Sequence, residues 1–177
     1  MRHNCFLSIV CGLALASLPA IAQAQTPDAD ICKNDPRFRA LDYVLGDWDV
    51  YSGEAKTAEV KMELILNDCV IKETWTVING RSTGNGIGLF NYSPLLSNWG
   101  YYWATDNGST TSFRGMLIEP GEMRFITERP LDEGKMRLRH WTLYAMEDGT
   151  IRELSVGTEG ADQGWTTEYD LRWVRKP

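Results

Sequence analysis

A period-two alternation of apolar and polar side chains runs from Gly46 nearly to the end of this 177-residue chain, and it constrains the fold more than any other feature. In one clear example, Val60, Met62 and Leu64 alternate with charged neighbours. Such alternation places apolar side chains on one face of a β-strand and polar side chains on the other. Turn sequences separate the alternating segments at Asn79-Gly80, Asp106-Asn107-Gly108, Glu119-Pro120-Gly121, Asp132-Glu133-Gly134 and Asp148-Gly149. We therefore expect roughly nine or ten successive antiparallel strands.

An open sheet of that length would leave two long unpaired edges, and closure into a barrel removes them. The expected fold is therefore all-β, a closed antiparallel up-and-down barrel. Gly84, Gly86 and Gly88 recur at spacing two and predict a strand that bends sharply, as a barrel corner requires. A phosphate-binding loop is the alternative for these glycines, but no helical pattern follows them.

A short helix is predicted just before the first strand. Asp35 and Pro36 are typical of a helix start, and Gly46 ends the pattern. Between them, one apolar stripe two to three turns long is formed at helical spacing by Phe38, Leu41, Val44 and Leu45. We expect this helix to pack across one mouth of the barrel.

The N-terminus has the pattern of a secretory signal peptide. Arg2 precedes an apolar run over residues 6–20, and Ala22-Gln23-Ala24 matches a signal peptidase site. We therefore expect a signal peptide at 1–24, a polar segment at 25–34 and one barrel domain at 35–177, in a periplasmic or secreted protein. A lipid anchor is the alternative, but Cys11 lies inside the apolar run instead of at the cleavage point.

The charge balance excludes some classes of partner. The chain carries 18 Lys and Arg against 24 Asp and Glu, a net charge of −6, and loss of Arg2 would make it more negative. An acidic chain with dispersed basic residues is a poor match for nucleic acid or an anionic membrane surface. No stretch after the leader resembles a transmembrane helix. We expect a monomer.

Cys32 and Cys69 are the cysteines that remain after the leader, and an exported chain meets an oxidising environment. A disulfide between them is the natural interpretation, and two buried free thiols are the alternative. A metal site is not expected, because His140 is the one histidine outside the leader and no close pair of Cys or His ligands occurs.

The Gly46-x-Trp48 pair resembles the start of the lipocalin and calycin barrels. The resemblance implies that Trp48 fills the closed end of the barrel and that a basic side chain near the last strand covers it. Arg172 is our assignment for that residue, with Arg175 as the alternative.

A closer resemblance is to a bacterial family of exported lipocalin-like domains of unknown function. The segments that carry it, in order, are Leu45-Gly46-Asp47-Trp48-Asp49-Val50, Asp68-Cys69-Val70-Ile71-Lys72-Glu73-Thr74-Trp75, Trp99 to Trp103 and Gly164-Trp165. It covers the chain from about Phe38 onward and implies a closed barrel without a recorded chemistry. Tyr101 stands where that family commonly has a polar amide.

Glu73 is the foremost candidate for a functional residue. Its parity on the strand matches that of Ile71 and Trp75, so it is expected to point into the barrel, where an unpaired carboxylate costs several kcal/mol or takes up a proton. Arg114, Arg139 and Tyr101 are the candidate partners. Glu73 is then an anchor for a ligand, a general acid or base, or one half of a pair that only fixes the barrel register.

The chain is unusually rich in large aromatic side chains, namely Trp48, Trp75, Trp99, Tyr101, Trp103, Trp141, Trp165, Tyr169 and Trp173. Most are expected to pack the core. The predicted ligand-binding set is Glu73, Trp75, Trp99, Tyr101, Trp103, Arg114 and Arg139. A cavity lined by such residues would suit a small hydrophobic or amphipathic molecule.

Three functions therefore stay open. The first is a small-molecule binding module, the second an isomerase or lyase that uses Glu73, and the third a solid barrel that acts through its outer surface. No cofactor is expected. Haem bound through His140 is the alternative, but a surface or core histidine fits that position better.

Overall fold

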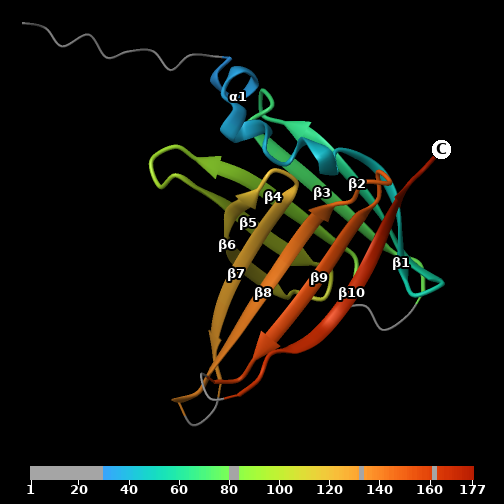
Figure 1. Cartoon of the computed structure of the whole chain (residues 1–177), viewed down its shortest axis with the longest axis vertical. Helices are drawn as coiled ribbons and strands as arrows, with labels where there is room; N and C mark the ends of the chain where they lie inside the picture. Colours follow the sequence, from blue (N-terminus) through green and yellow to red (C-terminus); the bar gives the residue numbers. More distant parts are fainter. Residues whose placement is uncertain (1–29, 80–83, 132–133, 161–162) are drawn as a thin grey trace, which may run out of the picture.

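Ten antiparallel strands close into a barrel in the computed structural model, which describes residues 30–79, 84–131, 134–160 and 163–177 (Figure 1). The strands are β1 Gly46–Ser52, β2 Ala55–Ile65, β3 Val70–Val77, β4 Gly86–Ser93, β5 Asn98–Thr105, β6 Thr110–Glu119, β7 Glu122–Pro130, β8 Met136–Ala145, β9 Ile151–Thr158 and β10 Thr166–Arg175. Each strand pairs with the next one in sequence, and β1 pairs with β10. The predicted all-β closed barrel is confirmed. The predicted signal peptide lies outside the described residues.

The period-two alternation sorts side chains between the inside and the outside of the barrel. On β1, Trp48 and Val50 are fully buried while Asp47 is exposed. On β9, Ile151 and Ser155 are buried and Arg152 is exposed. Inward side chains fill one half of the barrel with a continuous apolar core and line a cavity in the other half.

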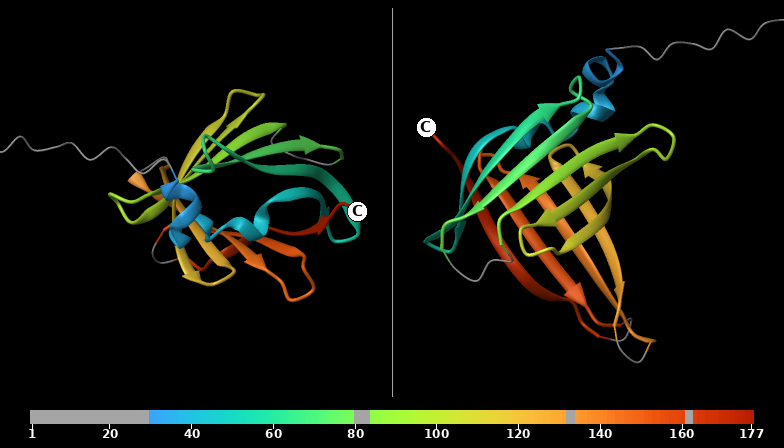
Figure 2. Two further views of the ribbon diagram at one scale, coloured as in Figure 1. Left: turned by 90° about the horizontal axis from the view of Figure 1, so that it is seen from above. Right: turned by 180° about the vertical axis from the view of Figure 1, so that it is seen from behind.

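The segment before β1 closes one end of the barrel, as predicted, but it is not a single helix. It consists of α1 Ile31–Asn34 and two short 3-10 turns, η1 Pro36–Arg39 and η2 Asp42–Val44. The Asp35 carboxylate accepts a hydrogen bond from the backbone N–H of Arg37 at 2.9 Å, so the predicted cap is present. Seen from above, the segment lies across the mouth of the barrel (Figure 2, left).

The break between the two turns follows from packing. Leu41, which joins them, has φ −105° and ψ 9°, and both Leu41 and Val44 are completely buried. The buried side chains Phe38, Leu41 and Val44 recur at spacing three, which matches the three residues per turn of a 3-10 helix. Among the described helices, none is long and apolar enough to cross a membrane.

The disulfide between Cys32 and Cys69 is confirmed. It joins α1 to the turn between β2 and β3, so part of the predicted polar segment 25–34 is anchored to the barrel. Arg39 adds a hydrogen bond from its Nη2 to the carbonyl oxygen of Asp68 at 2.8 Å. A covalent bond and a polar contact therefore hold the closing segment over the mouth.

Trp48 fills the closed end, as the resemblance implied, but Arg175 covers it and Arg172 does not. The Arg175 guanidinium lies 4.2 Å from the centre of the Trp48 ring, and its Nη1 donates to the carbonyl of Leu45 at 2.9 Å. The reason is parity, because Arg175 pairs directly with the inward Trp48. Arg172 pairs with Tyr51 and lies 5.7 Å from that ring on the outside of the barrel.

Candidate ligand-binding cavity

A cavity of about 480 Å³ occupies the half of the barrel farthest from α1. Since β1 begins at the closed end with Gly46, the cavity residue Ser52 marks the opposite end. The aromatic part of the lining consists of Trp75, Tyr101, Trp103, Phe113, Trp141 and Tyr169. The charged part consists of Glu73, Glu153, Glu168 and Arg139, and the small polar part of Ser52, Thr57, Asn79, Thr105, Ser109 and Thr111.

Glu73 points into this cavity from β3, as its parity predicts, and is 2 % exposed. Of the three candidate partners, Tyr101 contacts it: the phenol donates a hydrogen bond to Glu73 Oε2 at 2.7 Å. Burial raises the pKa of Tyr101 well above its ordinary value, and the nearby Glu73 raises it further, so the phenol keeps its proton. Tyr101 is therefore a permanent donor to this carboxyl.

Gly88 makes the contact between Glu73 and Tyr101 possible. It lies on β4 between the strands that carry them, and a Cβ there would fall 2.5 Å from both Glu73 Oε2 and Tyr101 Cε2. In the same way, a Cβ on Gly86 would fall 2.3 Å from Cζ2 of Trp103. These glycines, which the sequence suggested as a bend, leave the space into which the cavity side chains pack.

Gly88→Ala is expected to lower the free energy of unfolding by about 1–3 kcal/mol, because the added methyl group overpacks the wall of the cavity. Urea denaturation would measure this loss. Gly164→Ala is the matched control, since a Cβ there has no described neighbour within 4 Å. Equal stability of the two variants would contradict the close approach at Gly88.

Burial raises the pKa of Glu73 to about 8; the hydrogen bond from Tyr101 opposes this shift and the charge of Glu153 adds to it. At neutral pH the carboxyl is therefore mainly protonated. Within the described chain, neither lysine nor arginine forms an ion pair with it. Glu73 is a buried acid stabilised by dipoles and not by a positive charge.

Glu153 is a second buried acid in the cavity, and our sequence analysis missed it. It is 5 % exposed on β9 and accepts two indole hydrogen bonds, from Trp141 Nε1 to Oε1 at 2.9 Å and from Trp173 Nε1 to Oε2 at 2.8 Å. Burial raises its pKa to about 7, against the effect of these bonds. The sequence indicated only weakly that Glu153 faces inward, because the alternate residues Leu154 and Val156, which face outward on the same strand, are apolar.

An aromatic pair connects the two acids. The rings of Tyr101 and Trp141, which donate to Glu73 and Glu153 respectively, have centres 4.6 Å apart. Phe113 packs on both rings, at 5.6 Å from each. The two carboxyls thus belong to one hydrogen-bonded, ring-lined unit.

Arg139 lies in the cavity but is held by Glu168. Its Nε is 2.5 Å from Glu168 Oε2, and the same carboxylate contacts Arg137 and accepts a bond from Ser155 Oγ at 2.8 Å. The register between β9 and β10 shifts between Thr167 and Tyr169. This irregularity lets the adjacent residues Glu168 and Tyr169 both line the cavity.

Five of the seven predicted ligand-binding residues meet in this cavity: Glu73, Trp75, Tyr101, Trp103 and Arg139. Trp99 is buried but packs in the core, with its ring 6.0 Å from that of Tyr92. Arg114 is exposed on the outside of β6, because its inward neighbours are Phe113 and Gly115. Neither Trp99 nor Arg114 lines the cavity.

His140 also lies outside the cavity. Its strand neighbours Arg139 and Trp141 line the cavity, whereas its own ring packs on Trp165 with 4.3 Å between centres. The absence of a haem cofactor stays a prediction. In the part of the chain that the structure describes, no group of three His, Cys, Asp or Glu side chains could hold a metal ion.

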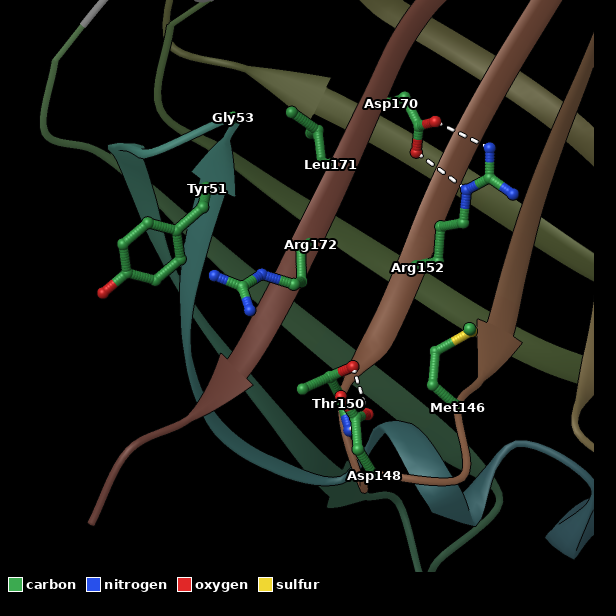
Figure 3. Close-up of a pocket in the computed structure, with 9 residues that line it drawn as sticks. All are labelled: Tyr51, Gly53, Met146, Asp148, Thr150, Arg152, Asp170, Leu171 and Arg172. Carbon is green, nitrogen blue, oxygen red and sulfur yellow. Dashed lines mark hydrogen bonds and ion pairs between the residues drawn. The ribbon is translucent and has the colours of Figure 1, made fainter.

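A second hollow of about 350 Å³ lies on the outside of the barrel, near the turn between β8 and β9 (Figure 3). Arg152 donates two hydrogen bonds to Asp170, at 2.9 and 2.6 Å, and Asp148 accepts from the hydroxyl of Thr150 at 2.6 Å. Arg172 extends toward Tyr51 at its edge. Because its acids are already bonded to neighbours, this hollow is a weaker candidate than the interior cavity.

No model of a known protein family matches the chain. No curated protein sequence matches it either. The closed antiparallel barrel is consistent with a lipocalin-like fold.

Proposed function

We propose that this protein is an exported binding module that holds a small amphipathic ligand inside the barrel, with Glu73 as a buried polar anchor. One observation carries the proposal: a cavity of about 480 Å³ combines six aromatic side chains with buried acids that have no basic partner among the described residues. Its size and its mixture of apolar walls with a few polar groups are typical of small-molecule sites.

Energetics support a ligand over a purely structural role for Glu73. A carboxyl buried without a cation costs free energy on folding, and a well-packed apolar side chain of similar size would avoid that cost. The barrel closes through backbone pairing of its ten strands, and the apolar core around Trp48 and Val50 packs without a contribution from Glu73. The cavity itself argues against a solid barrel that acts only through its surface.

Export and membership of the lipocalin-like family are part of the proposal. The leader pattern and the resemblance over Leu45 to Val50 support them, and the disulfide between Cys32 and Cys69 is of the kind that persists in an oxidising compartment.

Thr111→Phe is expected to weaken ligand binding at least about tenfold, because the ring would occupy the cavity opposite Trp103. The neutral flat dye N-phenyl-1-naphthylamine serves as the probe, and its fluorescence increase on binding gives the affinity. Thr110→Phe is the matched control, since Thr110 is exposed on the outer face of the same strand. If the dye fails to bind the unmodified protein, or if both variants bind it equally, the interior site is wrong.

An acid–base enzyme is the second candidate, and the pair of acids favours it. Glu73 and Glu153, with pKa values of about 8 and about 7, share one cavity and can hold different protonation states at neutral pH. For an isomerase or lyase of this kind, Glu73→Gln would remove turnover while substrate affinity survives. For a binding module, the same change would weaken binding.

A further inference from the structure

Neighbouring side chains donate hydrogen bonds to both buried acids. Tyr101 donates to Glu73, and the indoles of Trp141 and Trp173 donate one bond to each oxygen of Glu153. Donors on both oxygens favour the charged form of a carboxyl. Burial favours the neutral form. The surroundings therefore suit an anion that lacks only a positive charge.

The protein itself does not bring that charge to Glu73. The strands next to β3 present Met62 and Gly88 opposite Glu73, neither of which is charged. The titratable groups that face it from the remaining cavity strands are Tyr101 on β5, Arg139 on β8, Glu153 on β9, and Glu168 and Tyr169 on β10. Arg139 is the one cation of this set, and it is neutralised by Glu168.

Aromatic faces supply the rest of a cation site. The rings of Tyr101 and Trp103 are stacked with centres 6.3 Å apart, and the Trp141 ring lies 4.6 Å from Tyr101. The face of an aromatic ring carries negative electrostatic potential and attracts ammonium groups, most strongly where water is excluded. Two acids and several ring faces therefore act on the same space.

We propose that the ligand is an organic ammonium ion with an apolar body, bound with its charged nitrogen near Glu73 and Glu153, and that its entry releases a proton from Glu73 to solvent. This inference rests on the proposed function and specifies its ligand class. The charges balance, because the ammonium enters as the carboxyl proton leaves. The cavity then holds an ion pair in place of a neutral acid.

The expected pH dependence follows from Glu73. Its pKa of about 8 leaves the carboxyl mainly protonated at pH 7, and a bound cation lowers that pKa. Below pH 8 the affinity for an ammonium ligand should therefore fall by up to about tenfold per pH unit, with up to one proton released on binding. Glu153, with a pKa of about 7, adds to this release near neutrality.

Isothermal titration calorimetry with three probes that share one ring and differ in charge tests the inference: 2-phenylethylammonium, 2-phenylethanol and phenylacetate. Titrations at pH 7 in buffers of different ionisation enthalpy count the protons released. We expect the ammonium to bind at least tenfold more tightly than the alcohol, phenylacetate to bind most weakly, and a proton to leave.

Equal or tighter binding of the alcohol or phenylacetate, absence of ammonium binding, or binding without proton release would overturn the ammonium assignment. If N-phenyl-1-naphthylamine still binds in a manner sensitive to Thr111→Phe, the proposed function survives that failure. If the dye does not bind either, both fail.

Glu73→Gln should abolish most of the proton release and weaken the ammonium at least tenfold, which is a much larger loss than the same change causes for the alcohol. The amide oxygen can still accept the Tyr101 bond. Glu63→Gln is the matched control, because Glu63 lies on the outside of the barrel and pairs with Lys61 and Lys72. Proton counting on the unmodified protein decides the question even if Glu73→Gln fails to fold.

Discussion

Without ligand, the unmodified protein is expected to become less stable as pH rises from 5 to 8, and Glu73→Gln is expected to remove this decrease. Folding raises the pKa of Glu73 from 4.5 to about 8. In this window the unfolded chain releases the Glu73 proton while the folded chain keeps it. The contribution of the protonated Glu73 to the free energy of unfolding is therefore full below pH 4.5 and is lost as pH rises toward 8. The loss attributable to this one carboxyl is about 3–4 kcal/mol.

Urea denaturation at several pH values, on both proteins and without ligand, would measure this difference. Glutamine cannot ionise, so the gap between the two curves should widen steadily from pH 5 to pH 8 in favour of the variant. Glu63→Gln, which removes partly exposed ion pairs with Lys61 and Lys72 on the outside of the barrel, should follow the unmodified protein to within about 1 kcal/mol. Parallel curves for Glu73→Gln and the unmodified protein would show that Glu73 is not buried as an acid.

Removal of the disulfide is expected to have an effect of similar size. Cys32 and Cys69 are 37 residues apart, and a cross-link across a loop of that length contributes about 3–4 kcal/mol in the chain-entropy model. The variant with Cys32→Ala and Cys69→Ala should therefore unfold at markedly lower urea concentration. The loss should begin at the closed end, because the bond anchors α1 there.

Two measurements separate this effect from simple cavity formation at the cysteine sites. Reduction of the unmodified protein with dithiothreitol should give the same loss without any substitution. Hydrogen exchange should become faster first at the backbone amides of Asn34 and Asp35, whose hydrogen bonds close the turn of α1. If the free energy of unfolding fell by less than about 1 kcal/mol both on reduction and in the double variant, the closing segment would be held by packing alone.

The alternation of side chains is why so much of the architecture could be predicted from the sequence. Each strand has one face inside and one outside, so Val60, Met62 and Glu73 were assigned inward from parity alone, and they are buried. Parity fails where alternation is interrupted or both faces are partly apolar. Glu168 and Tyr169 are neighbours that both line the cavity, and Glu153 was hidden by the outward Leu154 and Val156.

Partners of the inward side chains were harder to predict, because the direction of several candidate side chains was ambiguous in the sequence. Arg114 and Tyr101 were both candidates for Glu73, and Arg114 is excluded because it faces outward on β6. The choice of Arg172 to cover Trp48 failed for a similar reason, since Arg175 is the residue opposite that ring. Pairing depends on where each turn starts the next strand, which a single sequence constrains weakly.

Because the closing segment covers one end of the barrel, the two ends have different functions. Trp48, Arg175 and the disulfide to Cys69 secure the end beneath α1, while the space next to Trp103 and Thr111 lies at the other. Of the two ends that the described residues form, the second is therefore the one from which a ligand would reach the cavity. Substitutions at that end could change which ligands enter while the packing at the closed end stays the same, which makes this barrel a practical starting point for engineered receptors.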